Sequence, residues 1–228
     1  MSTVTPAAAS LPTVSAAPAG VSRVRAGIVS AFLALGAVAV AVVVLWQPWG
    51  ERDHLGYADI APHRDAGWLG SIIDGLGIAA IGIALGLAVC MLARTRGSAL
   101  ANIGAVLTTF GGVAFCTGVV SFGSFAWYAT DIGAIPADSG AALMRHVEEN
   151  PGHMMGLQMA GFLLFTLGSI LLMAALWRAR SVPRWLPIGY LVLTVGVFVL
   201  SGVALNIVQA VQMLSLVVVA FHALRVTR

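Results

Sequence analysis

Long apolar runs separated by short polar segments occupy the chain from about residue 23 onward. Four of these runs cover residues 26–46, 68–93, 98–122 and 153–177, and an uncharged stretch follows over residues 185–224. Each run exceeds the roughly 18 apolar residues typical of a transmembrane helix. Lipid offers the backbone no hydrogen-bonding partner, and the runs lack the alternation of strands, so we expect helices.

The uncharged stretch is too long for one span. At about 1.5 Å per residue, a single helix over residues 185–224 would be roughly 60 Å long, about twice the thickness of a bilayer core. We therefore predict two helices, 185–203 and 206–224, with the break between Val203 and Asn206. The predicted fold is an all-α integral membrane protein, in which residues 23–228 form a single bundle of six transmembrane helices.

The segments outside these runs differ in character. Residues 1–22 are rich in Ala, Pro, Ser and Thr, and we predict that they form a disordered cytoplasmic tail. The first run is too long for a signal peptide and ends in Trp46 and Trp49, which we expect at the membrane interface. In the polar segment between the third and fourth runs, Asp138 and Ser139 can cap a short helix that ends near Asn150. We expect this helix to lie on the membrane surface.

The charges are distributed asymmetrically between the ends of the runs. The chain carries 12 basic residues, all of them Arg, and 9 acidic residues. Nine of the arginines fall within segments 23–25, 94–96, 178–184 and 225–228, whereas every acid lies in the opposite loops or, as Asp74, in the outer part of the second run. Positive residues concentrate on the cytoplasmic side of membrane proteins. We therefore expect both termini in the cytoplasm and the protein in the plasma (inner) membrane.

The composition excludes a soluble protein. Hydrophobic residues make up 59% of the chain and charged residues 9%, with a mean hydropathy of +0.95, whereas soluble domains carry about 25% charge. Membrane topology explains the positions of the arginines, so we do not expect nucleic acid as a partner. The expected partner is the lipid bilayer. The pattern resembles that of small six-span proteins of unassigned function from high-GC bacteria, and no specific family motif accompanies it.

One carboxylate lies inside a predicted span. Asp74 would lie about 9 Å below the outer end of its helix, and Gln158 and Gln209 about 8 Å into theirs. We predict that these three side chains, with Asn206, form one hydrogen-bonded layer. Charged groups within a membrane are costly and mark ion or proton pathways. The alternative is a structural clasp, in which polar side chains only hold helices together.

The segment 144–158 gathers further groups able to do chemistry. Imidazole and carboxylate ligands suit Zn²⁺, and thioethers suit Cu(I), so a transition metal is one possible ligand. The M-x-x-x-M spacing of Met155 and Met159 resembles that of copper-uptake channels, a likeness of two residues from which membership is not inferred. Solvated loops and packing methionines explain the same residues without a metal. The candidate metal residues are His146, Glu149, His153, Met155 and Met159.

Three functions remain open. The first is a small permease or channel-like protein that handles a cation or proton through the polar layer. The second is a non-catalytic membrane subunit or regulator, which could meet a protein partner or a second copy through the G-x-x-x-G face of Gly82 and Gly86. The third is a membrane-embedded metal-dependent enzyme. Walker A, H-E-x-x-H, G-x-S-x-G and C-x-x-C motifs are absent from the sequence, and no cofactor is predicted.

Overall fold

The computed structural model describes residues 23–50 and 56–225, and every regular element within these ranges is a helix. The predicted tail, residues 1–22, lies outside the described residues. The elements are α1 (Arg23–Trp46), α2 (Tyr57–Ile60), the 3-10 helix η1 (Ala61–His63), α3 (Arg64–Leu92), α4 (Ser98–Ala129), α5 (Ala137–Glu149), α6 (Pro151–Ala179), α7 (Trp185–Val199) and α8 (Gly202–Arg225).

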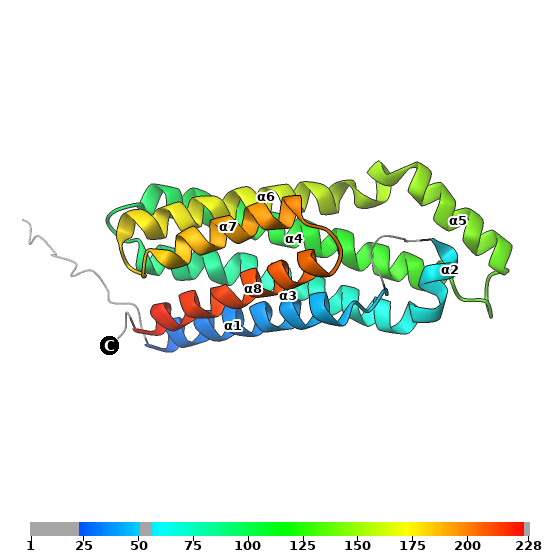
Figure 1. Ribbon diagram of the computed structural model, residues 1–228, viewed down its shortest axis with the longest axis horizontal. Coiled ribbons are helices and arrows are strands. Elements are labelled where there is room, and N and C mark those ends of the chain that lie inside the picture. Colours follow the sequence, from blue (N-terminus) through cyan, green and yellow to red (C-terminus); the bar gives the residue numbers. More distant parts are fainter. Residues whose placement is uncertain (1–22, 51–55, 226–228) are drawn as a thin grey trace, which may run out of the picture.

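The six longer helices α1, α3, α4, α6, α7 and α8 run along the long axis of one bundle (Figure 1). The α3–α4 and α6–α7 turns, the start of α1 and the end of α8 lie together at one end, which we call the basic end. The opposite end, which carries α2 and α5, is called the acidic end. The arginines of the basic end are Arg23, Arg25, Arg94, Arg96, Arg178, Arg180, Arg184 and Arg225.

The outer surface of the bundle is apolar. Five helical stretches are long and apolar enough to cross a membrane, and α7, with 15 residues, is shorter. Large hydrophobic side chains point outward along these helices, for example Leu35 with 71% of its surface exposed. Lipid is the solvent that suits such a surface. The expectation of an all-α, multi-pass membrane protein is therefore confirmed.

Glycines at seven-residue intervals bring α4 and α6 into close contact. Gly104 and Gly111 of α4 face Gly168 and Gly161 of α6, Gly118 faces Gln158, and a Cβ added to Gly111 would lie 2.8 Å from the Gly161 carbonyl oxygen. A period of seven keeps one seam of a helix facing its neighbour, and small residues at that seam let the backbones approach. The α4–α6 pair is consequently held by backbone against backbone.

The Gly82–Gly86 face, expected to be available to a partner or a second copy, is occupied by α4 of the same chain. A Cβ added to Gly86 would lie 2.8 Å from the Cβ of Ala105. The hydroxyl of Thr108 also donates a hydrogen bond to the Gly82 carbonyl at 3.0 Å. The motif therefore packs α3 against α4 inside the bundle, and a contact with a partner or a second copy stays a prediction.

The break between the last two helices lies four residues earlier than predicted. The Leu200 backbone N–H donates to the Gly196 carbonyl and ends α7, and Gly202 begins α8 with a φ of 59°. Glycine adopts this left-handed conformation without steric cost, which explains why the chain reverses here. Asn206, placed at the break by the sequence prediction, lies inside α8.

Helix α5 is present, and part of its apolar side packs against the rest of the protein. Met144 is 2% exposed and joins a cluster with Ile60 of α2 and Phe122 of α4. The residue preceding α5 is Pro136, and neither Asp138 nor Ser139 caps it through a side chain. The prediction of a helix in this loop is correct, whereas its expected cap is wrong; its position on the membrane surface stays a prediction.

Substitution of Gly111 by Ala is expected to destabilise the bundle by about 1–3 kcal/mol, because its Cβ would collide with the backbone of Phe165. The matched control is Gly156→Ala on α6, where an added Cβ meets no atom within 4 Å. Thermal unfolding of the two variants in detergent measures the difference. Equal unfolding midpoints would contradict the backbone packing described above.

Candidate functional site

A cavity of about 280 Å³ lies toward the acidic end, between α1, α3, α4, α6 and α8. Its polar wall is formed mainly by Ser71, Asp74, Gln158 and Gln209. Phe115, Val119 and Phe122 of α4 supply much of its apolar wall. The described residues that line it include no Arg, Lys or His. Among the described residues, the lining is thus mainly apolar, with one carboxylate, that of Asp74.

Three of the four residues of the predicted polar layer line this one cavity. Asp74, Gln158 and Gln209 come from α3, α6 and α8, and each is half-buried. Among the described residues, no hydrogen bond directly links Gln158 to Gln209. Asn206 lies outside the cavity wall and is 4% exposed, and its side-chain oxygen accepts no hydrogen bond from the described part of the chain.

Close glycine contacts fix the positions of these side chains. A Cβ added to Gly118 of α4 would lie 2.5 Å from the Cβ of Gln158 and 2.7 Å from its backbone nitrogen. Gly75, next to Asp74, approaches Cys116 in the same way, with 3.2 Å from an added Cβ to the Cys116 sulfur. The backbones that carry Asp74 and Gln158 are therefore held against α4.

The outer wall of the cavity is formed by the segment after α1, which turns inward. Gln47 has a φ of 51°, and the Trp49 indole N–H donates to the Ser71 hydroxyl at 3.1 Å. The Trp49 ring also meets Phe122 edge-on, with 6.2 Å between centroids. Gly67 leaves room for Trp49, since an added Cβ would collide with the ring. Trp49 was expected at the membrane interface; the structure adds its contacts over the cavity, and the interfacial position stays a prediction.

The glycines at the start of α3 were the sequence signal for this inward turn. Gly67 and Gly70 lie three apart on one face, where they accommodate Trp49 and Pro48. Small residues on one face of a helix indicate a close neighbour but not its identity. The sequence analysis accordingly missed Trp49, Pro48 and Ser71 as parts of the site.

A second, smaller cavity of about 40 Å³ lies deeper and shares Phe115 and Gln209 with the first. Beside it, the Gln212 amide donates to the Thr194 hydroxyl at 2.7 Å, and Thr194 donates to the Tyr190 carbonyl at 2.9 Å. Toward the basic end the core is apolar and fully buried, as at Leu172, Leu176, Leu186 and Leu216. Polar groups thus reach from the acidic end only part of the way through the bundle.

The five candidate metal residues do not meet at one place. Met155 and Met159 line the cavity, whereas His146, Glu149 and His153 are exposed and lie outside its wall. Within residues 23–50 and 56–225, no three His, Cys, Asp or Glu side chains are grouped so as to hold a metal ion. The described residues therefore supply thioethers at the cavity but no complete imidazole–carboxylate site.

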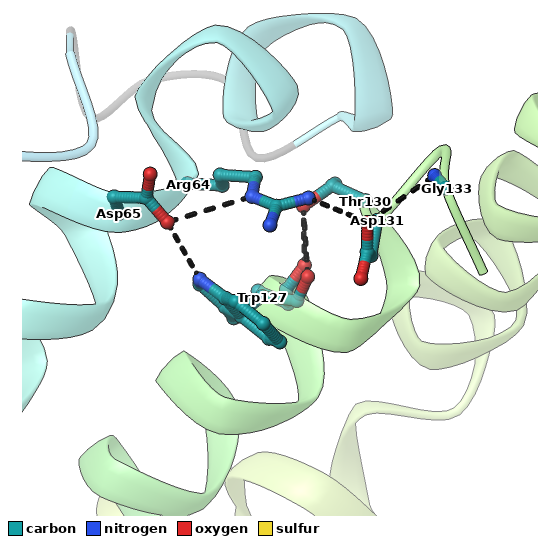
Figure 2. Close-up of polar contacts among 7 residues, drawn as sticks. Arg64, Asp65, Trp127, Thr130, Asp131 and Gly133 are labelled. Carbon is teal, nitrogen blue, oxygen red and sulfur yellow. Dashed lines mark hydrogen bonds and ion pairs between the residues drawn. The ribbon is translucent and has the colours of Figure 1, made fainter. Parts of the chain in front are cut away.

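A polar network joins the acidic ends of α3 and α4 (Figure 2). The Arg64 guanidinium forms an ion pair with Asp131 at 3.0 Å and lies over the Trp127 ring, 4.5 Å from its centroid. The Trp127 indole N–H donates to Asp65 at 2.7 Å, and the Gly133 backbone N–H donates to Asp131 at 3.2 Å. The hydrogen bond from Arg64, followed by that from Gly133, lowers the pKa of the Asp131 carboxyl.

Comparison with known proteins gives no relative: no family model, no curated protein and no solved structure matches this chain.

The ion pair predicts a dependence of stability on pH. Because the pKa of Asp131 is lower in the folded than in the unfolded state, its contribution is present above the unfolded value and is lost as pH falls through the folded one. Between about pH 6 and about pH 3, we expect the unfolding midpoint to fall more for the wild type than for Asp131→Asn. Asp138→Asn, at an exposed position of α5, is the control. Identical pH profiles for the wild type and Asp131→Asn would disprove this role.

Proposed function

We propose that the chain crosses the plasma membrane six times, with both termini in the cytoplasm. The two ends of the described chain lie at the same end of the bundle, which requires an even number of crossings (Figure 1). Helix α8 has 24 residues and is long enough to return from the far side, so α7 serves as the outward span that precedes it. The basic end, rich in arginine, faces the cytoplasm by the positive-inside rule.

We further propose that the protein is a small permease or channel-like protein that handles a cation or proton. The observation that carries this proposal is the cavity shared by Asp74, Gln158 and Gln209. Asp74 supplies a carboxylate to the wall of this cavity, and ionisable groups inside a membrane mark ion and proton pathways. Amide and hydroxyl oxygens from Gln158, Gln209 and Ser71 can replace part of the hydration shell of a cation.

The depth of Asp74 suits this role. Helix α3 begins at Arg64, so Asp74 lies about 15 Å along it at about 1.5 Å per residue. The cost of a carboxylate at such a depth falls when it lines a cavity that water can enter. The bond between Gln212 and Thr194 continues the polar groups inward from Gln209. Passage to the basic end then requires the apolar core beyond Leu172 to open.

The first test measures flux through the purified protein in liposomes. We expect uptake of H⁺, Na⁺ or K⁺ down an imposed gradient, and a rate lower by on the order of tenfold or more in Asp74→Asn, because the charge that attracts the ion is lost. Asp74→Glu should retain flux, and Asp138→Asn should leave it unchanged. No flux in the wild type, together with a less stable Asp74→Asn variant, would instead support a clasp in a non-catalytic subunit or regulator.

The second test addresses the metal-dependent enzyme. Because His146 and His153 are exposed and belong to no cluster of three metal ligands among the described residues, Zn²⁺ is expected to give the same small shift in unfolding midpoint for wild type and His146→Ala/His153→Ala. A parallel titration with Cu(I) compares Met155→Leu/Met159→Leu with wild type, because these thioethers face the cavity. Stabilisation by Zn²⁺ that disappears in the histidine double variant would instead support the third function, a metal-dependent enzyme.

A further inference from the structure

A second concave site lies at the basic end, remote from the cavity. It is a hollow of about 790 Å³ between the α3–α4 turn and the α6–α7 loop. Four arginines line it, Arg96 in the first segment and Arg178, Arg180 and Arg184 in the second. Two segments distant in the sequence thus direct positive charge into one space.

Close packing fixes the two segments relative to each other. Gly97 has a φ of 91°, and a Cβ added to it would lie 2.9 Å from the Ala175 carbonyl oxygen of α6. Arg180 ends α6 in the left-handed conformation, with a φ of 53°. The Arg184 guanidinium lies over the Trp177 ring, 5.6 Å from its centroid. The hollow is therefore formed by the fold and does not depend on a chance arrangement of long side chains.

No acidic side chain is available to neutralise these arginines. The sequence holds no Asp or Glu in residues 75–130 or 150–228, and both segments lie within these ranges. None of the four guanidinium groups forms an ion pair within residues 23–50 and 56–225. Like charges crowded together repel, and an anion bound between them relieves that repulsion. The amino end of α4, which begins beside the hollow at Ser98, adds the positive end of a helix dipole.

The level of the hollow relative to the membrane indicates the source of its ligand. Trp177 and Trp185, 42% and 61% exposed, lie just before and just after the α6–α7 loop. Exposed tryptophans at helix ends mark the headgroup level of a bilayer. Guanidinium groups bind phosphate oxygens in a bidentate manner. Basic pockets between transmembrane helices at this level suit phosphate-bearing headgroups.

We propose that this hollow binds the phosphate of an anionic phospholipid headgroup. The proposal rests on the membrane location of the chain and is independent of any transport through the cavity.

The test titrates phosphatidylglycerol into the purified full-length protein in detergent and follows the unfolding midpoint. We expect the half-saturating lipid concentration to rise on the order of tenfold in Arg96→Gln/Arg180→Gln, which removes one guanidinium from each wall. The matched control is Arg94→Gln/Arg225→Gln, which removes the same charge from the same end but outside the hollow, and it should change less than about twofold. Equal midpoints of all three proteins in phosphatidylcholine establish that they are folded.

Three outcomes would overturn the proposal. Equal weakening in both double variants would mean that the lipid responds only to the diffuse charge of the basic end. Stabilisation by phosphatidylcholine equal to that by phosphatidylglycerol would remove the requirement for an anionic headgroup. If inorganic phosphate reproduced the effect with the same dependence on Arg96 and Arg180, the ligand would be a soluble anion and not a lipid.

Discussion

The close approach of α4 to its neighbours is the constraint on which the rest of the structure depends. Within a bilayer, apolar side chains gain little by leaving lipid for protein, so helices associate where small residues allow backbone contact. Gly111 meets the backbone of Gly161 and Phe165 on α6, and on α3 Gly82 meets that of Thr108. These helices cannot move apart or slide without losing their packing contacts, because no flexible side chain lies between them. They fix α3, α4 and α6 as one unit, and the cavity is enclosed where α1 and α8 complete that unit.

Much of the fold could be predicted from hydrophobicity and charge, because a bilayer imposes a minimum span length and the arginines mark one side. The calculated depth of each residue along its helix placed Asp74, Gln158 and Gln209 at one level of the membrane. In the structure, all three line the wall of one cavity. Depth alone does not give direction around a helix, which is why Asn206 was included although it lies outside that wall.

What the sequence could not provide was the distinction between lipid-facing and protein-facing surfaces, since both are apolar. The Gly82–Gly86 face looked equally suited to a partner and to α4, and only the fold decides between them. Trp49 likewise carries the signature of an interfacial residue, yet it packs over Gly67 and bonds Ser71. The turn at Gly202 was missed for a related reason, because a stretch without charge does not mark where one helix ends and the next begins.

The packing also limits which parts of the molecule can move. The α4–α6 pair is fixed by backbone contacts near both sites, by Gly118 against Gln158 at the cavity and by Gly97 against Ala175 at the hollow. Helix α7 differs, because it packs mainly against α6 and α8 through side chains, and Thr194 is joined to Gln212 by a side-chain hydrogen bond. Apolar side chains can slide past one another where interlocked backbones cannot. Of the helices around the cavity and the apolar core, α7 is therefore the one we expect to move most readily against the unit of α3, α4 and α6. A disulfide that joined α4 to α6 should leave such a movement intact, whereas one that joined α7 to α6 should block it.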